Sequence, residues 1–374
     1  MVKILERLPL KSLIRFTSVS KRWRSIILSD PKFAKSQFQT ASDHQTCCHR
    51  VLISTPNESE FQSRNLGTPW SSLGDNSSVT KVRCPFNRPG TAVNLLCSCN
   101  GLVCALHVPE NHLYIWNPST GFFFKLPEPV GCPLKHRCLV YYGFGYLSAS
   151  DDYKLIAKLE LNAADDYDGD EVGGKEMHIF SSRANIWKTT EAPLDANFEY
   201  EGALSNEALH WPDNLDILAF DLAREEFRRL PLPTGDGDFR DLRAFGDCLC
   251  AFDFETLDLW VMKEYGVADS WTKLFKLKVS DQPEEIVGWW LVSVMETSTF
   301  LQKGTLCHGG GLVFDFIRSV HTEDNPEMHV LSRDTDFREM IEYQETLLWL
   351  GYSLIFRFQP PLFFIHWNCF GSHF

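Results

Sequence analysis

An apolar segment that ends at or near an aromatic residue recurs five times along the chain, and this repeat restricts the fold more than any other feature. The aromatic residues are Trp116, Phe180, Phe220, Trp260 and Phe314, which are 64, 40, 40 and 54 residues apart. Each segment leads through a polar turn toward a second apolar strand. Repeats of this period are typical of β-propellers, because one small sheet cannot bury both faces without neighbouring sheets. We therefore expect an all-β propeller.

Two hairpin signals between these aromatic residues support the same architecture. Asn100-Gly101 supplies the positive φ angles of a tight turn between strands at residues 95–96 and 102–103. A second hairpin is predicted over residues 202–211, with its turn at Ser205-Asn206. We expect each hairpin to form the inner strands of a propeller blade.

The charge of the chain divides at about residue 40. Of the 36 basic and 49 acidic residues, nine basic and two acidic ones lie in residues 1–40, a balance of +7. The other residues then hold 27 basic and 47 acidic side chains, a balance of −20. A nucleic-acid-binding domain needs a basic face for phosphates, so the acidic body argues against nucleic acid as a partner. The basic N-terminal stretch is the candidate for contact with an acidic partner.

The sequence predicts an intracellular protein, cytoplasmic or nuclear, with no membrane contact. Its longest uncharged run, Phe358–Phe374, has 17 residues and contains two prolines, which is too short for a bilayer-spanning helix. Charges at Lys3, Glu6 and Arg7 interrupt the position of a secretory signal. The 12 cysteines are therefore expected to be thiols, since the cytosol is reducing.

The basic stretch carries apolar residues at helical spacing, which predicts about three short helices in roughly 40 residues. Pro9 is expected to separate a first turn from the second helix, and Ser18 or Ser20 to cap the next helix. Asp30-Pro31 is expected to end that helix and begin another short turn. Such a unit is too small to be stable alone, so some of its apolar residues must face a partner or the following domain.

These residues resemble the plant F-box nearly position for position. The matching strings are Leu8-Pro9-Leu10-Lys11-Ser12-Leu13, Arg15-Phe16, Val19-Ser20-Lys21, Trp23-Arg24-Ser25-Ile26-Ile27 and Asp30-Pro31 with Phe33. The resemblance implies docking on a Skp-type adaptor and, through it, on a cullin ubiquitin ligase. The adaptor-binding residues that it implies are Leu5, Leu8, Pro9, Leu13, Val19, Lys21, Trp23 and Ile26. The alternative is a small helical cap that packs on the large domain.

The rest of the chain resembles the F-box-associated, kelch-like domain of plants. The matching strings are Ser98-Cys-Asn-Gly-Leu-Val103, Trp116-Asn-Pro-Ser-Thr120, Tyr142-Gly-Phe-Gly-Tyr146 with Asp151-Asp-Tyr-Lys154, Gly202-Ala-Leu204 with Ala208-Leu-His-Trp211, Phe220-Asp-Leu222, and Trp260-Val-Met-Lys-Glu-Tyr-Gly-Val267 with Ser270-Trp-Thr-Lys-Leu274. Glu342-Tyr-Gln-Glu-Thr-Leu-Leu348 resembles the closing strand of that family.

The expected fold class is thus α+β. It comprises a helical F-box at 1–40, a linker and first strands at 41–90, an all-β, kelch-like propeller at 91–350 and an aromatic tail at 351–374.

The function implied is that of the substrate-recognition subunit of an SCF-type (Skp-cullin-F-box) ubiquitin ligase. It would bind an unidentified protein substrate through the propeller, and it would have no catalytic residues and no cofactor. One alternative is a binding propeller uncoupled from the ligase. F-boxes usually begin with another Leu-Pro pair and an acidic residue about ten positions before the pair matched by Leu8-Pro9, and this sequence starts at Met1, too late to contain them. A kelch-type copper oxidase is a further alternative, although no His/Tyr set suited to copper stands out.

Other clusters of reactive residues favour structural interpretations. His44, Cys47, Cys48 and His49 are zinc-ligand types, but they lack the paired spacing of zinc sites. Cys97, Cys99, Cys248 and Cys250 form two Cys-x-Cys pairs, which predict small buried thiols on one face of a strand. An EF-hand that starts at Asp166 would place Glu171 at the glycine position, so a solvated acidic loop is favoured there. Gly309-Gly310-Gly311 has no serine elbow beside it and is interpreted as a strand entry.

Overall fold

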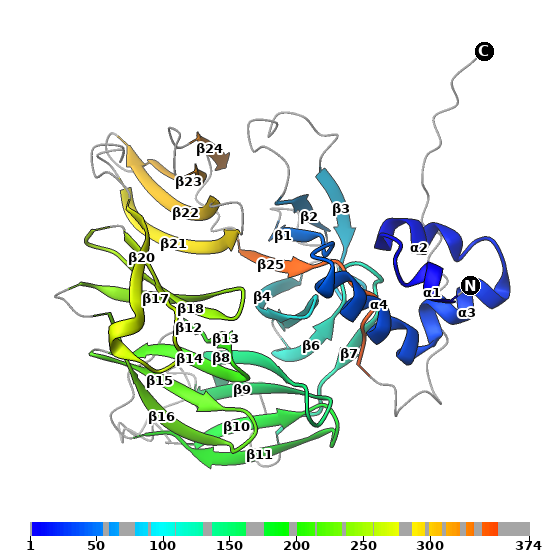
Figure 1. Cartoon of the computed structure of the whole chain (residues 1–374), viewed down its shortest axis with the longest axis horizontal. Helices are drawn as coiled ribbons and strands as arrows, with labels where there is room; N and C mark the ends of the chain where they lie inside the picture. Colours follow the sequence, from blue (N-terminus) through cyan, green and yellow to red (C-terminus); the bar gives the residue numbers. More distant parts are fainter. Residues whose placement is uncertain are drawn as a thin grey trace.

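The protein is described by a computed structural model. The structure describes residues 2–54, 60–66, 79–88, 91–108, 110–129, 137–161, 176–193, 200–213, 215–233, 237–256, 258–276, 286–295, 299–308, 312–321, 327–332 and 339–350. Among these residues the α-helices lie in the N-terminal region and strands form the six sheets that follow, which confirms the predicted fold class (Figure 1). The predicted aromatic tail, 351–374, lies outside these ranges.

Four N-terminal helices replace the three that were expected. They are α1 (Val2–Leu5), α2 (Leu10–Phe16), α3 (Lys21–Ser29) and α4 (Pro31–Asp43). Pro9 precedes α2 as predicted, and the Ser20 hydroxyl accepts a hydrogen bond from the Trp23 amide at 3.1 Å, so Ser20 caps α3.

The prediction of a short turn after Asp30-Pro31 was wrong, because α4 extends over 13 residues. The Asp30 carboxylate accepts hydrogen bonds from the amides of Lys32 at 3.0 Å and Phe33 at 3.4 Å. Pro31 occupies the first helical position, where its missing N–H has no partner to lose. An N-cap aspartate followed by proline is thus a strong helix start, and burial of Phe33 and Ala34 stabilises the helix that follows.

Six sheets surround a common axis in the described part of the chain, and the strands of each are given from the inner to the outer edge. The first sheet contains β25 (Met340–Gln344), β1 (His49–Ser54), β2 (Glu60–Asn65) and β3 (Val79–Arg83). The second sheet contains β4 (Ala92–Cys99), β5 (Leu102–Val108), β6 (His112–Trp116) and β7 (Phe123–Lys125). The third sheet contains β8 (Arg137–Leu147), β9 (Asp152–Leu161), β10 (Glu176–Ser181) and β11 (Ile186–Glu191), with β12 (Tyr200–Glu201) parallel to β8. The fourth sheet contains β13 (Ala203–Ser205), β14 (Ala208–Asp213), β15 (Asp216–Asp221) and β16 (Glu226–Pro231). The fifth sheet contains β17 (Phe239–Phe245), β18 (Cys248–Asp253), β19 (Asp258–Met262) and β20 (Trp271–Lys276). The sixth sheet contains β21 (Ile286–Met295), β22 (Thr299–His308), β23 (Leu312–His321) and β24 (Glu327–Ser332). A 3₁₀ helix, Ala268–Ser270, precedes β20.

The inner strands close the ring. β4 contacts β25 and β8, β8 contacts β13 and β14, both of these contact β17, and β21 contacts β17 and β25. β25 pairs antiparallel with β1, from His49 opposite Gln344 to Ile53 opposite Met340. The first sheet therefore joins the two ends of the propeller sequence (Figure 1).

The predicted repeat corresponds to the third strand of five sheets. Trp116, Phe180, Phe220, Trp260 and Phe314 lie on β6, β10, β15, β19 and β23. Residues 41–90, predicted as a linker with first strands, contain the end of α4 and three strands of the first sheet. Fully buried Trp116 packs against Phe61 of β2 at a centroid distance of 5.6 Å, which joins the first sheet to the second.

The two predicted hairpins form inner strand pairs, as expected. Asn100 and Gly101 have φ angles of 51° and 78° between β4 and β5. Between β13 and β14 the turn is one residue later than predicted. Asn206 and Glu207, with φ of 50° and 53°, occupy its corners, while Ser205 ends β13 opposite Ala208.

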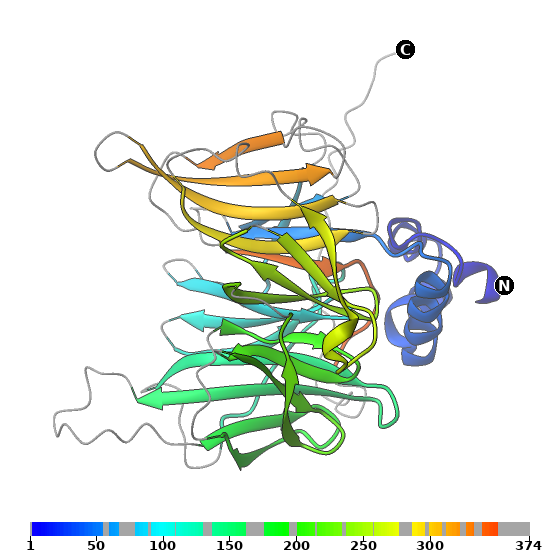
Figure 2. The same cartoon turned by 60° about the vertical axis from the view of Figure 1, so that its left-hand side comes forward.

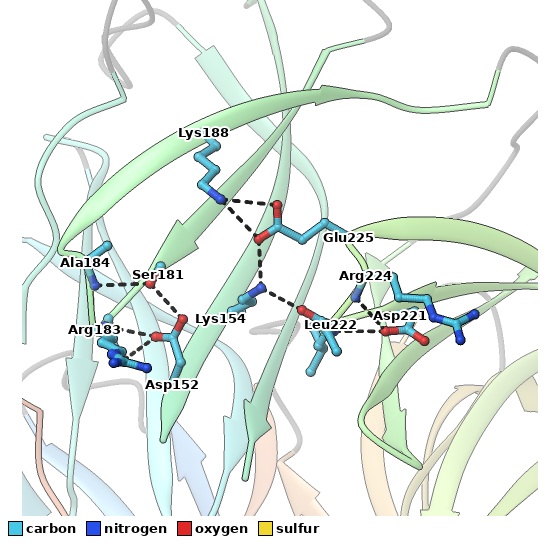
Figure 3. A network of polar contacts seen from close by, with 12 residues as sticks. Asp152, Lys154, Ser181, Arg183, Ala184, Lys188, Asp221, Leu222, Arg224 and Glu225 are labelled. Carbon is cyan, nitrogen blue, oxygen red and sulfur yellow. Dashed lines mark hydrogen bonds and ion pairs between the residues drawn. The ribbon is translucent and has the colours of Figure 1, made fainter. Parts of the chain in front are cut away.

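Charged side chains connect the third sheet to the fourth (Figure 3). The ammonium of Lys154, whose side chain is 8% exposed, donates to the Leu222 carbonyl at 2.6 Å and to the Glu225 carboxylate at 2.7 Å. Lys188 Nζ lies 3.4 Å from the same carboxylate. Burial alone would raise the pKa of Glu225, but the two ammonium groups lower it. Two lysines of one sheet thus hold a carboxylate of the next.

The N-terminal helices lie on one face of the ring (Figure 2). Lys35 of α4 forms an ion pair with Asp151, in the turn between β8 and β9. Because successive turns of an antiparallel sheet alternate between its ends, this face also carries the β4–β5 and β6–β7 turns. The opposite face carries the β5–β6, β14–β15 and β18–β19 turns, including Leu215, which is 88% exposed. None of the helices that the structure describes is long and apolar enough to cross a membrane.

Candidate adaptor-binding helices

A contiguous apolar cluster attaches the N-terminal helices to the ring. Its buried members include Leu5, Leu10, Leu13, Ile27, Phe33 and Ala34 from the helices, and Leu102, Leu113, Leu126, Leu347 and Leu348 from the ring. At about 25 cal/mol per Å² of apolar surface removed from water, a cluster of this size holds the helices in place. The small unit thus gains from the ring the core that it cannot build alone.

The eight predicted adaptor-binding residues divide between this cluster and the surface. Leu5 and Leu13 are 2% and 0% exposed, so both face the interior of this chain. Leu8, Trp23 and Ile26 are half-buried and pack against the cluster, and Pro9, Val19 and Lys21 are exposed. Six of the eight, all except Pro9 and Lys21, lie on the apolar stripe of the sequence, and that periodicity does not distinguish the two sides.

The N-terminal helices expose both apolar and basic side chains. Val19 is 61% exposed, and Ile4 and Val2, which the list of predicted adaptor-binding residues omits, are 67% and 41% exposed. Exposed basic residues include Lys3, Arg7, Lys11, Arg15, Lys21, Arg22 and Arg24. We call these apolar and basic residues, together with Leu8, Pro9, Trp23 and Ile26, the helical surface.

Local contacts fix the shape of the helical surface. The rings of Phe16 and Trp23 meet edge to face with centroids 5.3 Å apart, which joins the end of α2 to α3. The Thr17 hydroxyl donates to the Ile14 carbonyl at 2.6 Å and the Ser18 hydroxyl to the Arg15 carbonyl at 2.7 Å. Hydrogen bonds therefore hold the segment that carries Val19 to the end of α2, and the Phe16–Trp23 contact joins this end of α2 to α3.

Two members of the His/Cys cluster after α4 contact other side chains. His49 Nδ1 lies 2.6 Å from the Glu342 carboxylate, and Cys47 Sγ lies 3.7 Å from the Ser42 hydroxyl. Burial raises the pKa of the Cys47 and Cys48 thiols. Within the described ranges, no group of three or more His, Cys, Asp or Glu side chains could hold a metal ion.

The Cys-x-Cys pairs lie in strands, as predicted. Cys97 and Cys99 of β4 and Cys250 of β18 are buried, and Cys248 is half-buried. Burial raises the pKa of Cys250 to about 12, and it also raises the pKa of Cys97 and Cys99. Thiols of this kind are poor nucleophiles. The predicted acidic loop around Asp166 and Glu171 and the Gly309-Gly310-Gly311 segment lie outside the described residues.

Comparison with known proteins identifies both modules. A family described as F-box domain matches residues 1–35, and one described as F-box associated beta propeller domain matches residues 60–325. Relatives from Arabidopsis thaliana include F-box protein CPR1, 32% identical over 73% of this chain and 70% of that protein, and F-box/kelch-repeat protein At3g23880, 31% identical over 74% and 78%. The chain therefore belongs to the family of F-box proteins that carry an F-box-associated β-propeller domain.

Proposed function

We propose that this protein is the substrate-recognition subunit of an SCF-type ubiquitin ligase, in which the helical surface binds a Skp-type adaptor and the propeller binds a protein substrate. The observation that carries the proposal is the helical surface. It leaves apolar Ile4 and Val19 exposed to water, as it does several basic side chains, although other apolar side chains of the same helices are buried against the ring. An acidic adaptor with an apolar groove complements such a surface.

In this proposal the protein has no catalytic residues of its own. It raises the local concentration of substrate lysines near the conjugating enzyme that the cullin recruits. The face of the ring opposite the F-box is the face proposed for the substrate, because the F-box and its contacts occupy part of the other face. The proposed location is the cytoplasm or the nucleus, where such ligases act, and the proposed partners include neither nucleic acid nor membrane.

We expect Val19→Asp to weaken adaptor binding by roughly tenfold or more, because it places a negative charge in the proposed apolar contact. Val19 is 61% exposed, so the substitution should leave the free energy of unfolding nearly unchanged. The measurement is co-purification and titration of the full chain with a Skp-type adaptor.

Leu215→Asp is the matched control, since it replaces an even more exposed apolar residue on the opposite face of the ring. It should bind the adaptor like the wild type. If the wild-type chain fails to bind a Skp-type adaptor, the protein is a propeller uncoupled from the ligase. Equal adaptor binding by the wild type and by Val19→Asp would show that the helical surface does not bind the adaptor through Val19, contrary to the proposal.

A further inference from the structure

The segment that follows the closing strand lies between the ring and the F-box helices. We call residues 345–350 the latch segment. Thr346, Leu347 and Leu348 are 0%, 2% and 5% exposed, and the two leucines belong to the same apolar cluster as Leu10 and Leu13 of the F-box. In both overall views the chain beyond β25 runs between the helices and the second sheet (Figures 1 and 2). The latch segment therefore forms part of the seat on which the F-box rests.

One buried side chain of the second sheet holds the latch segment. Asn117, immediately after β6, is 0% exposed, and its Nδ2 group donates to the carbonyls of Thr346 at 3.0 Å and Leu348 at 2.6 Å. Its Oδ1 atom accepts from the amides of Ser119 at 2.8 Å and Thr120 at 3.2 Å. Both ends of the carboxamide are thus used, and the partners define its orientation: carbonyls face the nitrogen and amides face the oxygen.

Further contacts connect the latch segment to the chain that leaves the F-box. The Glu345 amide donates to the Cys48 carbonyl at 2.9 Å, and the Glu345 carboxylate lies 3.2 Å from the Arg50 guanidinium. The Trp349 ring packs against Phe122, with centroids 5.5 Å apart, in the turn that Asn117 begins. The latch segment is therefore bonded both to the second sheet and to the junction between α4 and β1.

We propose that Asn117 is a positioning residue, which sets the orientation of the F-box on the propeller through the latch segment. The Lys35–Asp151 ion pair is a weaker constraint, because its side chains are 40% and 52% exposed and exposed pairs contribute little. Asn117, by contrast, makes two desolvated hydrogen bonds to the segment beneath the helices. The proposal holds whether or not the helices bind an adaptor.

The test is amide hydrogen exchange of the full chain, with Asn117→Ala compared with Asp221→Ala. Asp221 makes an equivalent turn in the fourth sheet, where it accepts from the amides of Ala223 and Arg224 at 2.9 Å. It contacts neither the latch segment nor the F-box in the described hydrogen bonds. We expect Asn117→Ala to increase exchange in α2, α4 and the latch segment by roughly tenfold or more, with β13–β20 unchanged. Asp221→Ala should leave α2 and α4 unchanged.

Asn117→Asp separates positioning from turn formation. It keeps the acceptor for Ser119 and Thr120 and loses the donors to Thr346 and Leu348, so it should release the helices without loosening the β6–β7 turn. If Asn117 variants fail to fold, Leu347→Ala weakens the same seat from the other side and should give the same local pattern. Unchanged exchange in α2 and α4, or a uniform increase over all six sheets, would overturn the proposal.

Discussion

Replacement of Gly101 by alanine is expected to lower the free energy of unfolding by about 3 to 5 kcal/mol. Gly101 has a φ of +78° in the β4–β5 turn, where a residue with a Cβ atom loses of the order of 1 kcal/mol or more. Here the added Cβ would also overlap the Gln344 carbonyl oxygen and the Thr346 methyl group, at the end of the closing strand. Backbone cannot move aside as a flexible side chain can, so the overlap displaces the strand that closes the ring.

Gly121→Ala is the matched control for this prediction. Gly121 has the same φ of +78°, but an added Cβ would have no atom within 4 Å. Its cost should therefore be conformational only, about 1 kcal/mol. Chemical denaturation of the two variants measures the difference directly. Equal losses of stability would show that the close approach of Gly101 to the closing strand contributes nothing.

Acidification is expected to destabilise the propeller through His210. This residue is 0% exposed, its Nδ1 atom donates to the Ala203 carbonyl at 3.0 Å, and its Nε2 atom accepts from the Tyr265 hydroxyl at 2.6 Å. Arg228 in turn donates to the Tyr265 oxygen at 3.0 Å. Burial, together with the positive charge of Arg228, lowers the pKa of His210 to about 4.

The direction of this pH effect on stability follows from proton binding by the folded and the unfolded chain. An unfolded histidine has a pKa near 6.5, so between pH 6.5 and 4 the unfolded chain binds a proton that the folded chain does not. The contribution of His210 is therefore complete above pH 6.5 and is lost as the pH falls. The loss should reach about 2 kcal/mol at pH 5 and about 3 kcal/mol at pH 4.

The measurement is the free energy of unfolding at several pH values for the wild type and His210→Gln. Carboxylates titrate in both proteins, so the difference between the two curves isolates the histidine. We expect the difference to shrink as the pH falls, because only the wild type loses stability through this residue. Parallel curves between pH 7 and 4 would contradict the prediction.

Much of the fold is predictable because its signals are local. Asn100-Gly101 specifies its turn through positive φ angles, and the aromatic residue on the third strand marks five of the six sheets. The first sheet does not show this repeat, because its strands come from distant parts of the sequence. The aromatic residue of its third strand, Phe61, also lies near the start of the strand instead of near its end. The turn at Asn206 and Glu207 was misplaced by one residue because glutamate seldom adopts positive φ.

The candidate site is predictable only in part. A helical stripe shows that Leu13 and Val19 are apolar, but it cannot show that one packs on the ring while the other reaches solvent. That division depends on Leu347 and Leu348, which are more than 300 residues away from both in sequence. The role of Asn117 is likewise invisible in a turn motif, because its second pair of hydrogen bonds goes to the far end of the chain.

The pairing of β1 with β25 has a consequence for synthesis on the ribosome. β1 is synthesised early, and its inner edge stays unpaired until the residues of β25, which begin at Met340, have been translated. During that interval an unpaired edge is open to nascent chains nearby, a situation that favours wrong pairing. A chain that ends before residue 340 would lack β25, so the inner edge of β1 would stay unpaired and the ring would stay open.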